Sequence, residues 1–274
     1  MSGSGTSANG DGVPFTVRRT PGPALAGLVC EIIGYDENGH ALRGAVETAS
    51  LVAPLIISFG DAFSIALGRA PSSNDRWASF AAGLYAGPVL MDSTGAAACV
   101  QVNFTPQGAH RFFGLPMSEL ADRMVTLDEL GDRDILRLRE QLGSADDWNR
   151  RLDIAEAFVA ARLRRAPRVD AAIEHTYRRM LAAHGDIRMS RLARDLGWSR
   201  KHLAARFRDE FGLAPKAIAR IIRFQSVLAQ ARRAGSGGWA GVAATCGYSD
   251  QAHLTREFVE LAGTTPSRWL AQAR

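Results

Sequence analysis

The sequence contains few cysteines, almost no lysine and no long hydrophobic run. Its three cysteines, Cys30, Cys99 and Cys246, lie far apart and form no Cys-x-x-Cys pair. This pattern argues against a disulfide framework and a cysteine zinc site. Residues 1–12 are small and polar, so we expect a disordered tail and not a signal peptide. No apolar run approaches the ~20 residues that a membrane helix needs. We therefore expect a cytoplasmic protein with reduced thiols and no membrane contact.

Sequence motifs of catalytic and metal sites are also missing. The six histidines show neither the His-x-His nor the His-Glu-x-x-His spacing of metal ligands. The first half of the chain has no glycine-rich phosphate loop and no Gly-x-Ser-x-Gly elbow. We expect no catalytic residue, no bound metal and no cofactor.

The basic residues are almost all arginine, and they are unevenly distributed. Of 33 basic residues, only Lys201 and Lys216 are lysines, and 28 acidic residues bring the net charge to +5. Residues 1–168 hold 16 arginines and 19 acidic residues, a net charge of −3, whereas residues 169–274 hold 17 basic and 9 acidic residues, a net charge of +8. This asymmetry indicates a polyanionic partner for the second part of the chain.

The front part of the chain has the patterns of a β-rich domain. Leu55–Phe59 is a short apolar run that ends at Gly60, as expected of a buried strand. In Cys99–Phe104 the apolar residues alternate with Gln101 and Asn103, which is the two-residue period of a strand. Glycines and prolines separate these runs at the spacing of an antiparallel sheet or barrel.

Helical patterns follow this β-rich segment. We expect helices at 106–113, 117–124 and 148–163. In the last of them, Leu152, Ala155, Val159 and Leu163 form an apolar stripe, which either makes a dimer or packs within its own domain. The segment 164–168 contains Pro167 and is expected to be a linker. The domains are thus predicted as 13–165, which is β-rich with flanking helices, and 169–274, which is all helical; the fold class is α+β.

The basic domain contains an internal repeat. Leu192–Ser199 recurs fifty residues later as Val242–Ser249. After one inserted residue the match resumes at an offset of 51, pairing Leu203 with Leu254, Phe207 with Phe258, Gly212 with Gly263 and Pro215 with Pro266. Each copy predicts a short helix, a glycine turn with positive φ, an aromatic at the corner, and a second helix capped by serine. This is the helix-turn-helix pattern, whose second helix can lie in a DNA major groove.

The two copies together favour DNA over other partners. A single copy would also fit a two-helix hairpin of any helical bundle, but two copies lie where the positive charge is concentrated. Between them, Lys216–Ala234 has helical spacing and predicts a rod of roughly 28 Å. Such a rod would place the two recognition helices in successive major grooves, ~34 Å apart. A module that binds acidic protein is the other possibility at this point.

The end of the sequence carries a more specific resemblance. Cys246–Phe258 followed by Gly263–Pro266 resembles the signature of AraC-type (AraC/XylS) transcriptional regulators, and the resemblance extends over 169–274. The segments 80–88, 102–109 and 115–120 resemble the cupin-like sensor domains of one subgroup. The resemblance implies a bacterial, cytoplasmic regulator with a cupin-like barrel for a small-molecule effector, promoter DNA and RNA polymerase as partners, and a possible homodimer. The alternative is a cupin-type enzyme or ligand-binding protein tethered to DNA, for which His40 and His110 are too few metal ligands.

The family's motif positions imply a set of DNA-binding residues. Gln suits adenine and Arg or Lys suits guanine, so Arg256 is the best candidate for a base contact. Ala204 and Ala205 stand where long polar side chains are common, which leaves more of the readout to the second recognition helix. Arg206 is expected to contact phosphate or solvent. The full expected set is Ser199, Arg200, Lys201, Ala204, Ala205, Arg208, Ser249, Gln251, Ala252, His253, Thr255 and Arg256.

The effector site is expected in the β-rich domain. Trp77, Phe80, Tyr85 and the strand 100–104 either line the barrel or belong to its core. Arg43 either meets an anionic ligand or is solvated. The sequence does not indicate which effector binds, nor whether the regulator activates or represses.

Overall fold

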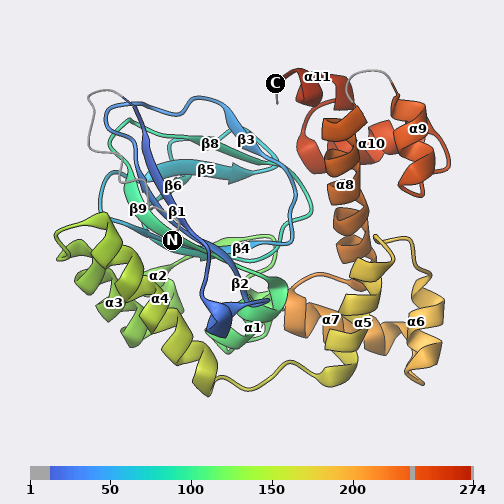
Figure 1. Cartoon of the computed structure of the whole chain (residues 1–274), viewed down its shortest axis with the longest axis horizontal. Helices are drawn as coiled ribbons and strands as arrows, with labels where there is room; N and C mark the ends of the chain where they lie inside the picture. Colours follow the sequence, from blue (N-terminus) through green and yellow to red (C-terminus); the bar gives the residue numbers. More distant parts are fainter. Residues whose placement is uncertain (1–12, 235–237, 273–274) are drawn as a thin grey trace, which may run out of the picture.

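The computed structural model describes residues 13–234 and 238–272, so the expected tail at 1–12 lies outside the described residues. Figure 1 shows a β-rich first half with helices against one side, and a helical second half beside it. The α+β fold class is confirmed: strands dominate the first half and helices the second. None of the described helices is both long and apolar enough to cross a membrane.

The β-rich half consists of two antiparallel sheets that do not close into a barrel within the described residues. The larger sheet has the order β1-β2-β9-β4-β7-β10, and the smaller sheet has the order β3-β8-β5-β6. The strands are β1 (Phe15–Arg19), β2 (Val29–Asp36), β3 (Ala45–Glu47), β4 (Ala53–Ser58), β5 (Phe63–Leu67), β6 (Arg76–Trp77), β7 (Phe80–Ala82), β8 (Val89–Asp92), β9 (Ala98–Phe104) and β10 (Met124–Thr126).

Helices cover the outer face of the larger sheet. They are η1 (Pro23–Leu25), α1 (Pro106–Phe113), η2 (Met117–Glu119), α2 (Leu127–Leu130), α3 (Arg133–Gly143) and α4 (Trp148–Arg165). Val100, Val102 and Phe104 of β9 are fully buried on this face, and the Phe104 ring lies 4.5 Å from that of Phe112 in α1. The apolar stripe of α4 is likewise buried, and α4 packs against β2, β9, α1 and α3 of its own chain.

The prediction of a helix at 117–124 is wrong. Only Met117–Glu119 is helical there, as the single turn η2, and Met124–Thr126 forms β10, which pairs with β7. The chain reverses between them at Asp122, whose φ is +56°. The run is too short for its apolar spacing to separate a helix from a turn followed by a strand, and the pairing with β7 decides it.

The second half is entirely helical. Its helices are α5 (Ala171–Ala182), α6 (Met189–Asp195), α7 (Arg200–Phe211), α8 (Pro215–Ala234), α9 (Trp239–Thr245), α10 (Gln251–Ala262) and α11 (Pro266–Gln272). In Figure 1, α8 runs as a rod between the group α5–α7 and the group α9–α11. No helix or strand lies between the end of α4 at Arg165 and the start of α5 at Ala171.

Candidate nucleic-acid interface and ligand cavity

The repeated sequence folds into two helix-turn-helix units, α6/α7 and α9/α10. Gly197 and Gly247 make the turns with φ values of +68° and +74°, the left-handed conformation that glycine adopts without a steric penalty. The paired residues of α7 and α10 point inward as predicted, since Leu203, Phe207, Leu254 and Phe258 are all at most 1% exposed. Each unit therefore presents the opposite face of its second helix to the outside.

The two recognition helices begin with different caps. In α7, the Ser199 hydroxyl accepts a hydrogen bond from the His202 backbone N–H at 3.1 Å, as expected. In α10, the cap is Asp250, whose carboxylate accepts from the His253 N–H at 2.7 Å, so the expected Ser249 cap is wrong. The residue inserted in the second copy moves the helix start by one position and makes Asp250 the structural equivalent of Ser199.

Most of the residues expected to bind DNA lie in the first two turns of the recognition helices or just before them, whereas Arg208 lies in the last turn of α7. Those that are exposed are Ser199, Arg200, Lys201, Ala205, Arg208, Ser249, Gln251, Ala252 and Arg256, while Ala204, His253 and Thr255 are half-buried. The Ser249 hydroxyl bonds Asp250 and the His253 ring, which fixes these three side chains against one another. No residue of this set belongs to the buried core.

Arg256 has no ion-pair partner among the described residues, because its acidic neighbours are already bound. Glu257 is 6% exposed and pairs with Arg220 and Arg223 of α8, each at 3.1 Å. Glu257 also accepts a hydrogen bond from the Tyr248 hydroxyl at 2.7 Å, and Glu260 pairs with Arg220. These contacts hold α10 on α8 and leave the Arg256 guanidinium exposed.

Arg206 behaves differently from the other cations of α7. It is half-buried and pairs with Asp170 at 3.1 Å and with Glu210 at 2.9 Å. The expectation that it contacts phosphate or solvent is therefore wrong, because the start of α5 lies against this part of α7 and supplies its acidic partners. Arg200, Lys201 and Arg208 have no ion-pair partner among residues 13–234 and 238–272, so they carry the free positive charge of α7.

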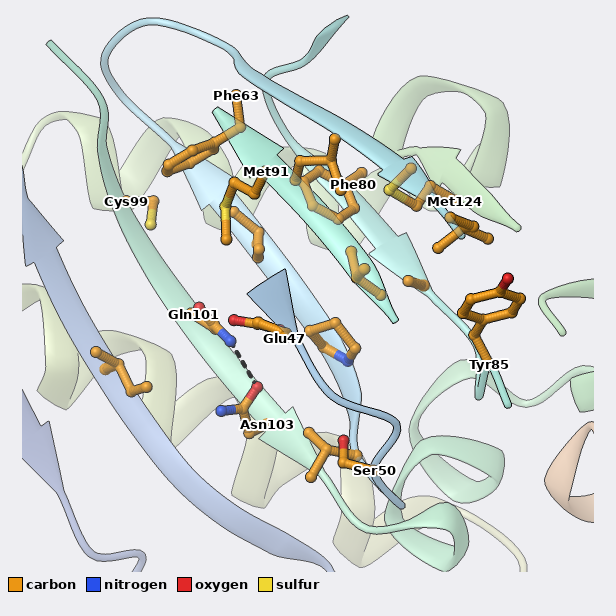
Figure 2. A pocket seen from close by; sticks show the side chains of 18 of the residues that line it. Glu47, Ser50, Phe63, Phe80, Tyr85, Met91, Cys99, Gln101, Asn103 and Met124 are labelled. Carbon is orange, nitrogen blue, oxygen red and sulfur yellow. Dashed lines mark hydrogen bonds between the residues drawn. The ribbon is translucent and has the colours of Figure 1, made fainter. Parts of the chain in front are cut away.

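A cavity of about 390 Å³ lies between the two sheets. Figure 2 shows labelled side chains from β3, β5, β7, β8, β9 and β10 around it, with an aromatic and methionine-rich end and a polar end. The apolar lining residues include Ile33, Ile56, Phe63, Ile65, Phe80, Tyr85, Val89, Met91, Cys99 and Met124.

The polar end of the cavity contains a chain of hydrogen bonds on β9 and β2. The Gln101 side-chain amide donates to the side-chain carbonyl oxygen of Asn103 at 2.8 Å (Figure 2). The side-chain amide of Asn103 donates in turn to the Glu31 carboxylate at 3.1 Å. Arg18 of β1 pairs with the other oxygen of Glu31 at 2.6 Å. The negative charge of Glu31 is thereby balanced within the protein.

Glu47 at the end of β3 also faces this cavity, and its carboxylate points toward Gln101 in Figure 2. It has no hydrogen-bond or ion-pair partner among the described residues. Enclosure by protein atoms raises the pKa of Glu47 above its ordinary value, although the cavity leaves the side chain open to solvent.

The residues expected to bind an effector are placed in two different surroundings. Phe80 and Tyr85 line the cavity, as do Gln101 and Asn103 of the expected strand. Trp77 is not among the lining residues; its ring packs on Phe80 at 6.0 Å, and its N–H donates to the Ile65 carbonyl. Arg43 is exposed and also lies outside the lining.

Sequence reasoning missed Glu47, Glu31 and Arg18 as lining residues. The one signal was the alternation in β9: the polar residues opposite its buried face turn toward the cavity and not toward bulk solvent. For Glu47 there was no signal, because a three-residue strand has no readable period. In the described residues, no group of three or more His, Cys, Asp or Glu side chains could hold a metal ion.

One wall of the cavity touches the second helix-turn-helix unit. Glu47, Thr48, Ala49 and Ser50 line the cavity, and the Ala49 backbone N–H donates to the carbonyl of Leu261 in the last turn of α10 at 2.8 Å. Gly263 directly follows the end of α10, and a Cβ on it would lie only 3.1 Å from the ring of Pro88. The end of α10 is therefore packed closely on the β-rich half.

The first unit docks on the same half through the equivalent position. A Cβ on Gly212, which ends α7, would lie 3.0 Å from the carbonyl oxygen of Met117 in η2. Gly212 and Gly263 are the equivalent positions of the repeat, and both have positive φ. The two recognition helices thus end against the β-rich half while their starts stay open.

Comparison with known proteins finds two matching families. Residues 192–272 match the family of helix-turn-helix domains, and residues 18–126 match a domain of unknown function (DUF6597). No curated protein matches the chain significantly.

Several solved structures are similar at low sequence identity. ToxT from Vibrio cholerae O395 is 9% identical, with 84% of this chain and 95% of that chain covered and a TM-score of 0.45. ToxT bound to (E)-4-(8-methylnaphthalen-1-yl)but-3-enoic acid is 7% identical, with coverage of 95% and 98% and a TM-score of 0.46. The AraC-like transcriptional activator CuxR is 17% identical, with coverage of 84% and 99% and a TM-score of 0.25. Since all three scores are below 0.5, function must be argued from the residues of this chain.

Proposed function

We propose that the helical half of this chain, which matches the helix-turn-helix domain family over residues 192–272, is an AraC-type DNA-binding module, and that the protein is a sequence-specific transcriptional regulator controlled by a small molecule. One observation carries the proposal. The exposed faces of both recognition helices bear cations without ion-pair partners among the described residues, at Arg200 and Lys201 of α7 and Arg256 of α10. Nearby acids such as Glu210 and Glu257 are paired inside the helical half. Free arginine and lysine at such positions attract phosphate and read base edges.

The length of α8 supports binding in two successive grooves. Its 20 residues correspond to about 30 Å, close to the ~34 Å between adjacent major-groove faces on one side of the duplex. The two units dock on the β-rich half through equivalent glycines, which keeps both helix starts on the open side.

The second recognition helix offers more side chains that can hydrogen-bond to base edges than the first. Arg256 and Gln251 are exposed; an arginine can donate to O6 and N7 of guanine, and a glutamine can accept from N6 and donate to N7 of adenine. Ala204 and Ala205 of the first recognition helix offer only methyl groups, which suit thymine methyls or close backbone approach. Arg200, Lys201 and Arg208 would then position α7 on the phosphates.

Control by an effector is supported by the contact between the cavity and α10. The segment that lines the cavity beside Glu47 also donates the Ala49–Leu261 hydrogen bond to the second recognition helix. A ligand that moves this segment changes how α10 is held. Such a regulator acts on RNA polymerase at a promoter, so we place it in the bacterial cytoplasm, where both are found.

A mobility-shift titration with the DNA upstream of the protein's own gene, against a scrambled fragment of equal length, tests the proposal. Arg256→Ala should weaken specific binding by ~1–3 kcal/mol and leave non-specific binding nearly unchanged. Arg268→Ala, an exposed arginine on α11, should not change the ratio of the two affinities and serves as the control.

The outcomes of this titration separate the two uses of Arg256. Equal losses on both fragments would make it a phosphate contact. A wild-type protein that does not distinguish the fragments, tested over a range of salt, would contradict sequence-specific regulation.

A further inference from the structure

Two acidic residues line the cavity, and only one of them is paired within the described residues. Glu31 is neutralised by Arg18 at 2.6 Å and accepts from Asn103 at 3.1 Å, so it has little capacity left for a ligand. Glu47 has neither a cation nor a hydrogen-bond donor in the part of the chain that the structure describes. Glu47 is therefore the acidic residue of this cavity whose charge no described residue balances, and it remains accessible from solvent.

Gln101, beside Glu47, adds an unused acceptor and no cation. One N–H of its side-chain amide donates to Asn103, and its side-chain carbonyl oxygen accepts no hydrogen bond from a described residue. In Figure 2 the Glu47 carboxylate and the Gln101 side chain lie next to each other at the polar end of the cavity. A ligand group that satisfies both must donate hydrogen bonds, and a positive charge strengthens each of them.

The remainder of the cavity suits an apolar body. Phe63 and Phe80 are almost fully buried, and Tyr85, Met91 and Met124 complete this end. Methionine side chains adapt to irregular apolar shapes, and aromatic faces attract cations. The volume of about 390 Å³ lies within the range of small-molecule sites.

An anionic ligand would meet a less favourable site. Arg18 is already bound to Glu31, and Arg123, the other arginine that lines the cavity, is an exposed residue next to Met124. A ligand carboxylate at the polar end would lie beside Glu47 and be repelled by it. Only the Arg123 side of the cavity offers a cation to an anion.

We propose that this cavity binds a small amphiphilic amine, with its ammonium group bound by Glu47 and Gln101 and its apolar body against the phenylalanine and methionine side chains. The inference rests on the proposed function in one respect, since it names the chemical class of the effector. Enclosure raises the pKa of Glu47, although the side chain is open to solvent, and an ammonium group bound beside it would favour its charged form. Glu47 lies two residues before Ala49, so binding there acts on the segment that holds α10.

Three probes with the same alkyl chain test this assignment: decylamine, decanol and decanoate. Each is titrated calorimetrically into the full-length protein below its micelle concentration. Decylamine should bind at least about 10-fold more tightly than decanol, because a charged hydrogen bond is worth more than a neutral one. Decanoate should bind more weakly than decanol.

Glu47→Gln and Arg123→Gln provide the matched variants. Glu47→Gln should weaken decylamine binding by about 10- to 100-fold and leave decanol within about threefold, which shows that the cavity is still formed. Arg123→Gln should leave decylamine binding unchanged. The assignment would be overturned in favour of an anionic ligand by the opposite result: decanoate binds most tightly of the three probes, and its affinity is lost in Arg123→Gln and kept in Glu47→Gln.

The same samples separate this inference from the proposed function. If decylamine binds through Glu47 but the protein does not distinguish specific from scrambled DNA, the ligand class stands and the regulator proposal fails. If DNA is recognised specifically but no probe prefers Glu47, the regulator proposal stands and the ligand class is wrong. A change in specific DNA affinity with decylamine, absent in Glu47→Gln, supports both.

Discussion

At the scale of single residues, Glu210 joins the first recognition helix to the start of the helical half. It is 3% exposed, accepts a hydrogen bond from the Asp170 backbone N–H at 3.2 Å and pairs with Arg206 at 2.9 Å. Burial raises the pKa of Glu210 to about 7, a rise that the Asp170 N–H and Arg206 only partly oppose. Between the ordinary carboxyl pKa of 4.5 and this value, the folded chain holds a proton that the unfolded chain has lost.

This difference predicts a pH dependence of stability. Because the folded-state pKa is raised, the Glu210 contribution to the free energy of unfolding falls as pH rises from about 4.5 to about 7 and is constant above. Glu210→Gln keeps an acceptor for the Asp170 N–H without a charge. Urea unfolding between about pH 5 and pH 8 should therefore show the variant gaining stability relative to wild type as pH rises.

Asp209→Asn is the matched control, since Asp209 is the neighbouring acid on α7 and is exposed. Its unfolding free energy should stay close to the wild-type pH profile, because Asp209 makes the smallest of the contributions to the pKa of Glu210. Parallel profiles for wild type and Glu210→Gln would contradict the role assigned to burial of Glu210.

At the scale of elements, the N-caps of the two recognition helices can be compared directly, because the repeat places them at equivalent positions. Asp250→Ala should lower the free energy of unfolding by ~1 kcal/mol, because the His253 N–H loses its acceptor. Ser249→Ala should cost less, since the Ser249 hydroxyl bonds side chains and not the first backbone N–H groups of α10. Ser199→Ala in α7 should resemble Asp250→Ala. Urea unfolding of the three variants checks this order, and a larger loss for Ser249→Ala than for Asp250→Ala would contradict it.

The helical half was predictable from sequence to within a residue or two. Most of its signals are local, since the glycine of each turn and the inward pairs four residues apart lie within about twenty residues. The recurrence at 50 and 51 positions then repeats the same local pattern. The cap at Ser249 was wrong because the inserted residue could not be assigned to one side of the turn from a single sequence. The surroundings of Arg206 were wrong because its ion pair with Asp170 depends on how the start of α5 packs against α7. The alternation in β9 was also readable, since a strand has a two-residue period.

The cavity was not predictable in the same way. Which side chains line it depends on the pairing of β3 with β8 and on how the two sheets face each other, which are contacts between distant segments. Trp77 and Phe80 are neighbours in sequence and share an aromatic contact, yet only Phe80 lines the cavity. The helix expected at 117–124 failed for a similar reason, because the pairing of β10 with β7 overrides the local pattern.

At the scale of the whole molecule, three supports set the relation between the two recognition helices. The rod α8 connects them, Gly212 docks α7 on Met117, and the Ala49–Leu261 hydrogen bond with the Gly263–Pro88 contact docks α10 on the β-rich half. If any one of these supports is lost, the other two still connect the recognition helices. If the protein binds DNA as proposed, these supports favour one spacing of the two half-sites over others.

This rigidity predicts how the protein responds to altered DNA spacing. In a fragment that it binds specifically, inserting five base pairs between the half-sites turns the second one to the opposite side of the duplex, and inserting ten restores the side but adds about 34 Å. Both insertions should lower the affinity by at least about 10-fold, because the contacts of one recognition helix are lost. The same insertions outside the half-sites should have no effect in the mobility shift. Tolerance of the ten-base-pair insertion would contradict a single rigid reader, because it requires two chains that each place one unit on the DNA.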